Sequence, residues 1–182
     1  KPHRPPTDSL SQVGQRIGRW LEPSRSAAPC PGNRPLLLLL LPLLCISLRG
    51  ASFQAGVARV SITPPVPFWL TGYAARTKPA ESVRSELFAK ALALRDSQGG
   101  RFVLVTTDLI GLPREVSDAV AERLQREEDL PRAQLVLNAS HTHAGPVIWP
   151  NLRVLFAFDA AEQARVEAYS RRLADDLTAV VG

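Results

Sequence analysis

The chain has 182 residues and is 45% hydrophobic, which is enough for one domain with a real core and excludes a largely disordered protein. Its formal net charge is +5, but seven of the 22 Lys and Arg residues lie in residues 1–50 with two of the 17 acidic residues, which leaves 15 of each from residue 51 onward. The part expected to fold is therefore electrically balanced, and we exclude nucleic acid as an expected partner.

The first 52 residues differ in composition from the rest. Residues 1–34 are rich in Pro, Ser and Arg, so we interpret them as a disordered or spurious upstream extension. Residues 35–48 form an apolar run interrupted by Pro42; it is short for a bilayer span but typical of a signal peptide. We interpret residues 35–52 as a signal peptide, with a membrane anchor as the alternative, and expect a secreted, periplasmic or membrane-anchored protein.

Both cysteines, Cys30 and Cys45, lie in this leading segment, so the domain that follows contains no thiol for a disulfide. That is compatible with an oxidising compartment. The sequence lacks methionine and stops directly after a helical pattern. We therefore interpret the chain as a fragment, with residues 53–182 as part of a larger domain.

Three strands are predicted first, at residues 53–62, 86–96 and 101–108. The last two flank Ser97-Gln98-Gly99-Gly100, which favours a hairpin. The unbroken apolar run at residues 102–105 predicts a strand covered on both faces. Between the first two strands, residues 69–74 include Trp69 and Tyr73, and we expect burial of these aromatic rings to hold that loop in place.

A helix is predicted from Pro113 to Leu130, because apolar residues recur there every four positions. A buried strand at residues 133–137 follows, and the order strand, helix, strand implies a parallel pair. A long helix then begins after Asp159, with Glu162 as the capping-box partner. Its predicted apolar face consists of Val166, Tyr169, Leu173, Leu177 and Val180. The expected fold class is α/β, a layered mixed β-sheet flanked by helices.

His141 and His143 follow the strand predicted at residues 133–137. In extended backbone two side chains that are two residues apart point to the same side, so both imidazoles can face one metal ion or one substrate. A polar loop whose histidines form only hydrogen bonds is the alternative. Zinc takes three or four ligands, and His3 lies in the leading segment, so either further ligands come from beyond Gly182 or the site is incomplete.

Asp108 ends the strand predicted at residues 101–108, next to the strand that precedes the histidines. Sites in open α/β sheets form beyond the carboxyl ends of strands, so Asp108 could converge with the histidine pair. It could equally cap the helix near Pro113 or accept hydrogen bonds from loop amides.

The segments 56–65 and 71–74, the strand ending in Asp108, and residues 140–146 occur in an order that resembles the N-terminal part of the neutral/alkaline non-lysosomal ceramidase family, over about residues 55–150. The resemblance implies a secreted or membrane-tethered zinc amidase that splits ceramide into sphingosine and a fatty acid. It implies a layered α/β catalytic domain followed by a β-sandwich. It also implies that His141 is the first zinc ligand and that His143 contacts the reacting amide, with a further His, a Glu and a Tyr beyond Gly182.

The sequence departs from the family pattern at Ala144 and at Val147-Ile148-Trp149, and we expect these bulky residues to reshape the loop beside His141. The expected function is that of an exported Zn²⁺-dependent hydrolase of an N-acyl bond in ceramide or a related lipid amide, with a membrane surface as a possible partner. Activity of this fragment alone is not expected. The alternatives are another metal-dependent amidohydrolase or esterase, such as a barrel enzyme, and a non-catalytic exported domain.

Overall fold

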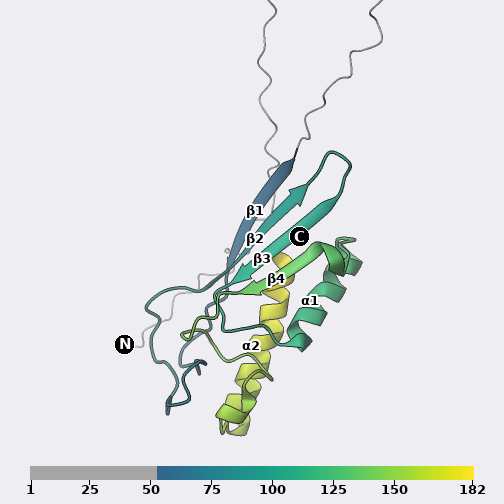
Figure 1. Cartoon of the computed structure of the whole chain (residues 1–182). Coiled ribbons are helices and arrows are strands. Elements are labelled where there is room, and N and C mark those ends of the chain that lie inside the picture. Colours follow the sequence, from purple (N-terminus) through teal and green to yellow (C-terminus); the bar gives the residue numbers. More distant parts are fainter. Residues whose placement is uncertain (1–52) are drawn as a thin grey trace, which may run out of the picture.

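The computed structural model describes residues 53–182, so the interpretations of residues 1–34 and 35–52 lie outside the described part. Six regular elements follow one another along the chain (Figure 1): β1 (Gln54–Ser61), β2 (Phe88–Arg95), β3 (Arg101–Thr107), α1 (Arg114–Glu127), β4 (Leu135–Ala139) and α2 (Ala160–Ala179). Short 3-10 turns at Arg132–Gln134 and Arg153–Leu155 precede β4 and α2.

The four strands form one sheet in the order β1-β2-β3-β4. The pairs β1–β2 and β2–β3 are antiparallel and β3–β4 is parallel, which confirms the predicted mixed sheet. In the hairpin between β2 and β3, Asp96 Oδ1 accepts hydrogen bonds from the amides of Gln98 and Gly100, both at 2.8 Å. An aspartate that binds the amides two or more residues later stabilises such a turn, so the hairpin prediction is also confirmed.

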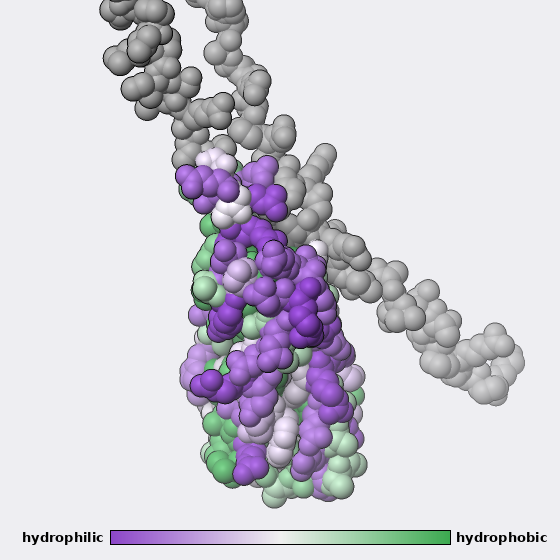
Figure 2. All heavy atoms as spheres, turned by 90° about the vertical axis from the view of Figure 1, so that its right-hand side faces the viewer, coloured by the Kyte–Doolittle hydropathy of each residue, from purple (hydrophilic) through white to green (hydrophobic). Residues whose placement is uncertain are grey.

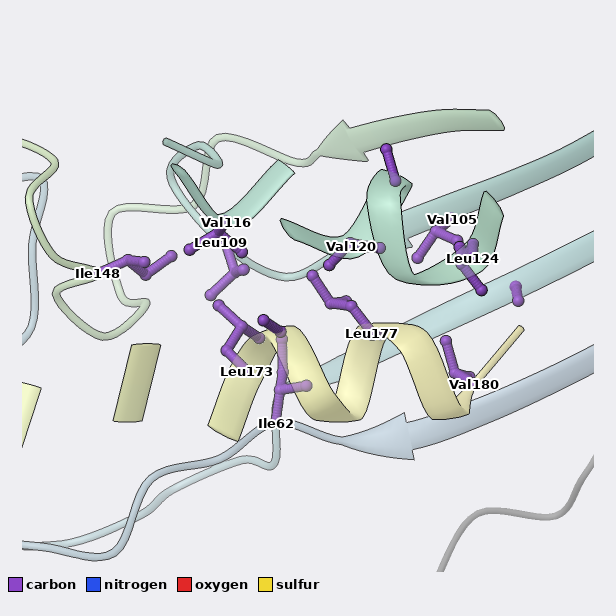
Figure 3. Close-up of a cluster of buried hydrophobic side chains, with 14 of the residues drawn as sticks. Ile62, Val105, Leu109, Val116, Val120, Leu124, Ile148, Leu173, Leu177 and Val180 are labelled. Atoms are coloured by element: carbon purple, nitrogen blue, oxygen red, sulfur yellow. The ribbon is translucent and has the colours of Figure 1, made fainter. Parts of the chain in front are cut away.

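Both helices cover the same face of the sheet. One row of paired residues on that face is Ala93, Val103 and Leu135, and all three are buried. Figure 3 shows side chains of α1 and α2 pointing toward one another, among them Val120 and Leu177. The core therefore lies between one sheet face and two helices, as a layered α/β arrangement requires.

The prediction that β3 is covered on both faces is wrong for the described part of the chain. Val57, Leu92, Leu104 and Val136 are paired in a row across all four strands. Val57 is 74% exposed and Val136 is 41% exposed. An unbroken apolar run has no period of two, so the sequence did not reveal that helices cover only the other face.

The last strand begins later than predicted, at Leu135 and not at residue 133. Pro131 is followed by a 3-10 turn that occupies residues 132–134, and a 3-10 turn is a common connector between regular elements. The strand is also less buried than predicted, since Leu135 is its one fully buried residue. β4 ends at Ala139, only two residues before His141.

The second helix starts as predicted. Asp159 accepts a hydrogen bond from the Glu162 amide, and Glu162 accepts one from the Asp159 amide, which confirms the capping box. All five residues of the predicted apolar face are buried. Tyr169 donates a 2.7 Å hydrogen bond to the Ile62 carbonyl, and burial raises the pKa of this phenol.

The opposite sides of the helices face solvent. Figure 2 views the right-hand side of Figure 1, where α1 lies, and hydrophilic residues predominate there with smaller hydrophobic areas between them. Polar outer faces are what helices packed on a sheet require. Within residues 53–182, neither helix combines the length and apolar character that crossing a bilayer demands.

Candidate functional site

The histidine loop begins at the sheet edge where the carboxyl ends of β3 and β4 meet. The pairing of these parallel strands continues one residue past β4, because the Ser140 amide donates to the Thr107 carbonyl at 3.0 Å. The Thr142 amide donates to the Leu109 carbonyl at 3.2 Å. The loop is therefore fixed to the chain that leaves β3, in the position where ligands bind in open α/β sheets.

His141 is held by its ring and its backbone. Its Nδ1 lies 2.9 Å from the Ile110 carbonyl oxygen, and because a carbonyl oxygen only accepts, Nδ1 carries the proton. The lone pair is then on Nε2, and the side chain is exposed. The backbone φ of 60° is a left-handed conformation that non-glycine residues rarely adopt. A carbonyl that fixes the tautomer in this way is the usual support of a metal-binding histidine.

His143 lies beside it, with 5.2 Å between the two ring centroids and an interplanar angle of 68°. The two imidazoles are therefore neighbours, although the left-handed φ of His141 replaces the extended backbone that was assumed. His143 is half-buried, and its backbone carbonyl accepts a 2.7 Å hydrogen bond from Arg76 Nη2. The two histidines thus differ, since one is exposed with a free ring nitrogen and the other is enclosed by a second loop.

That second loop runs from residue 69 to residue 76 and pairs with the chain just after His143. The Thr71 amide donates to the Gly145 carbonyl, and the Val147 amide donates to the Trp69 carbonyl, both at 2.9 Å. Gly72, with φ of 99°, lies directly against His143: a Cβ at Gly72 would meet the His143 Cβ at 2.6 Å. Only glycine fits a site with both this φ and this approach.

The prediction that aromatic burial holds this loop is half right. Trp69 is partly buried, contacts the rings of Phe156 and Phe158 and donates from Nε1 to Glu162 at 2.8 Å. Tyr73, in contrast, is 58% exposed. Its ring contacts that of His143 edge-on, with 5.0 Å between centroids. Trp69 therefore anchors the loop, whereas Tyr73 is exposed to solvent and contacts His143.

Asp108 forms hydrogen bonds with the backbone of Phe88. Its Oδ2 accepts a 2.9 Å hydrogen bond from the Phe88 amide, and its own amide donates to the Phe88 carbonyl at 3.0 Å. Of the roles considered from the sequence, the one observed is the satisfaction of a backbone amide. Asp108 extends the pairing of β2 with β3 and so supports the start of the site.

Two of the departures from the family pattern, Val147 and Ile148, lie in the core, whereas Ala144 is exposed. Val147 is 0% exposed and Ile148 is 1% exposed, and Figure 3 shows Ile148 among the buried side chains. Trp149 lines a hollow of about 370 Å³ between α1 and α2. The side chains of Val147 and Ile148 therefore point into the protein, and the expectation that the bulky residues reshape the loop beside His141 stays a prediction.

In the part of the chain from residue 53 to residue 182, no three His, Cys, Asp or Glu side chains are grouped so that they could hold a metal ion. His141 supplies one suitable donor, its free Nε2. Sequence reasoning identified both histidines but missed Arg76, whose contact with His143 is to a backbone atom. Gly72 and Tyr73 lie in the segment 71–74, which is part of the family resemblance, but the sequence indicated no role in the site for either residue.

The family model for the N-terminal part of neutral/alkaline non-lysosomal ceramidases matches residues 53–162. The neutral ceramidase of Drosophila pseudoobscura pseudoobscura is 35% identical over 118 residues, and that of Drosophila melanogaster is 31% identical over 118 residues. Each match covers 61% of this chain and 16% of the relative, so the chain spans only 16% of the length of these relatives.

A solved structure of ceramidase complexed with C2 shares the fold, with a TM-score of 0.55 and 22% sequence identity. The likeness covers 71% of this chain and 20% of the solved one. The fold shared with this chain is thus one part of a longer chain in that protein.

Proposed function

Because the chain belongs to the neutral/alkaline non-lysosomal ceramidase family, we propose that the protein is an exported zinc-dependent hydrolase. Its substrate is the N-acyl bond of ceramide or a related lipid amide, and its products are a sphingoid base and a fatty acid. The observation that carries the proposal is the His141 ring, whose Nδ1 is bound to the Ile110 carbonyl and whose Nε2 is free on an exposed side chain. Export is supported by the apolar run at residues 35–48.

The donor chemistry at His141 fits zinc. A neutral imidazole with its other nitrogen bound to a carbonyl is a strong and well-oriented zinc ligand. His141 would hold the ion through Nε2, and the remaining ligands would come from outside residues 53–182. The chemistry that zinc supplies when bound is Lewis acidity toward a carbonyl group and activation of a water molecule near neutral pH.

The two histidines would divide the work. His141 fixes the place of the reaction relative to the sheet, because both its ring and its loop are bound to the segment that leaves β3. His143, with its ring 5.2 Å away, would hydrogen-bond the oxygen of the reacting amide or transfer a proton to the leaving nitrogen. A half-buried imidazole held by a second loop is suited to this role, because it keeps one orientation without being closed to substrate.

Two observations bear on the alternatives. Val147 and Ile148 are buried in the core, so these two departures from the family pattern do not themselves favour another amide or an ester over ceramide. The sheet begins with two antiparallel pairs, which does not match a barrel of parallel strands each followed by a helix. A non-catalytic exported domain is separated from the proposal by experiment.

The test is the release of fatty acid from labelled ceramide by the full-length protein, with and without a zinc chelator. We expect hydrolysis that the chelator abolishes, that added zinc restores, and that His141→Ala removes. Ser140→Ala is the matched control, because Ser140 is exposed and its recorded bond is made by the backbone. A folded, zinc-loaded protein that releases no fatty acid from ceramide or other N-acyl lipids would contradict the proposal and favour the non-catalytic domain.

A further inference from the structure

Residues 71 to 76 of the second loop, called the 71–76 loop below, have contacts that the proposed reaction does not by itself require. The two ends of this loop are fixed by backbone pairing at Thr71 and by a turn in which the Arg76 amide donates to the Tyr73 carbonyl at 3.2 Å. Between these ends, Gly72 approaches His143 so closely that a Cβ at Gly72 would lie 2.6 Å from the His143 Cβ. The loop therefore forms one wall of the space that His143 occupies.

Arg76 fixes the backbone of His143. Its Nη2 donates a 2.7 Å hydrogen bond to the His143 carbonyl, and a charged donor makes a stronger bond than a neutral one. The partners are 67 residues apart, so the bond joins two segments that are distant in the sequence. The carbonyl belongs to the residue whose side chain would contact the amide, and a shift of this backbone would move the imidazole with it.

Tyr73 fixes the ring of His143. The Tyr73 ring contacts the His143 imidazole edge-on, at 5.0 Å and 75°, which is a favourable arrangement for two aromatic rings. The Arg76 guanidinium carbon in turn lies 5.3 Å from the Tyr73 ring centroid, within reach of a cation–π interaction. Guanidinium, phenol and imidazole therefore form a continuous series of contacts that ends at His143.

The arrangement is costly for a loop with a packing role alone. Arg76 Nε and Thr71 Oγ1 are buried and have no hydrogen-bond partner among residues 53–182, and buried polar groups without partners destabilise the fold. Tyr73 leaves 58% of its surface in solvent, so it gains little from burial. Such local costs concentrate at functional sites.

We propose that Arg76 and Tyr73 are positioning residues, which hold the backbone and the ring of His143 in the orientation needed to contact the reacting amide. The inference rests on the proposed function, since it assigns these residues to the same reaction. Neither residue needs to touch the metal or the substrate to act in this way. The inference predicts an effect on the chemical step with little effect on zinc binding, because the zinc ligand His141 is fixed separately by Ile110.

The experiment compares Arg76→Ala, Arg76→Lys and Tyr73→Ala in the full-length protein, with labelled ceramide as substrate. We expect Arg76→Ala to lower kcat about 100-fold, because a displacement of about 1 Å has this effect, with KM and zinc content close to wild type. Arg76→Lys should recover about tenfold of that loss, because its ammonium can still donate to the carbonyl but cannot stack on Tyr73. Arg84→Ala is the control, since Arg84 is exposed on the same connection.

A second measurement does not depend on activity. Labelling by diethyl pyrocarbonate, located by fragment mass spectrometry, reports how freely the His143 ring reacts. We expect faster labelling of His143 in Arg76→Ala and Tyr73→Ala and no change in Arg84→Ala. If wild type cleaves no lipid amide, the proposed function fails while this labelling still tests the positioning.

Two results would overturn the inference. One is unchanged kcat together with unchanged His143 labelling in both Arg76→Ala and Tyr73→Ala. The other is a loss of zinc that parallels the loss of kcat, because that indicates a general structural role. Tyr73 is exposed, so its replacement tests the contact with His143 without removing a buried side chain.

Discussion

Replacing Gly72 by alanine should impair catalysis far more than an alanine at another glycine of the same conformation. A Cβ at Gly72 would lie 2.6 Å from the His143 Cβ and 2.7 Å from its Cα. Carbon atoms in good contact are about 3.5–4.0 Å apart, so the two segments must separate by about 1 Å. Because one of the atoms is the backbone Cα, rotation of the His143 side chain cannot relieve the overlap.

Gly99 provides the control. Its φ of 87° resembles the 99° of Gly72, and a Cβ there would meet nothing within 4 Å. Both substitutions therefore incur the cost of a left-handed conformation, about 1–2 kcal/mol, and Gly72→Ala adds overpacking of about 1–3 kcal/mol. The displacement of His143 should lower kcat/KM about 100-fold. The assays are fatty-acid release and urea unfolding of the full-length protein, and equal kcat/KM for Gly72→Ala and Gly99→Ala would refute the reasoning.

Three further predictions concern the fold. Tyr169→Phe leaves the Ile62 carbonyl without its buried partner and should lower the free energy of unfolding in urea by about 1–3 kcal/mol. Because burial raises the pKa of Tyr169, the wild type should lose stability as the pH rises above 10.0 more steeply than the variant. Equal slopes of unfolding free energy against pH in the two proteins would count against this prediction. Burial also raises the pKa of Asp176, so the stability linked to its protonation is present below the ordinary pKa of 3.8 and is lost as the pH rises through the raised pKa. Asp176→Asn should remove that part of the pH dependence of urea unfolding. An unchanged dependence of stability on pH would argue against this prediction. Residues 51–182 expressed alone should be poorly soluble, because the apolar row that includes Val57 is open to solvent; a soluble monomer that unfolds cooperatively would contradict this.

Local signals predicted most of the fold. The capping box at Asp159 and the turn at Asp96 each act within a few residues, so sequence spacing is enough to find them. The helix that follows Asp159 has its predicted apolar face because the period of 3.6 residues determines which side chains meet the core. Which faces of the sheet are covered depends on where the helices pack, and the run at residues 102–105 carries no such information.

The site likewise has a part that local sequence signals predicted and a part that depends on contacts between distant segments. His141 and His143 were predicted as a pair on the assumption of extended backbone, in which residues two apart share a side. Their rings are indeed 5.2 Å apart, but His141 has a left-handed backbone with φ of 60°, so the pair forms by a different geometry. Arg76 was not predicted, since its bond is to a backbone carbonyl 67 residues away and any residue type provides that acceptor. The Phe88 amide that binds Asp108 was equally invisible in the sequence. Contacts to the backbone are thus the part of a site that a pattern of side chains cannot reveal.

The zinc content of the purified full-length protein tests the central claim most directly, measured for wild type, His141→Ala and His143→Ala. The account predicts about one tightly bound zinc in wild type, a large loss in His141→Ala, and near-normal zinc but little fatty-acid release in His143→Ala. Full zinc content in His141→Ala, with its structure intact, would contradict the assignment of His141 Nε2 as the ligand and the mechanism that depends on it.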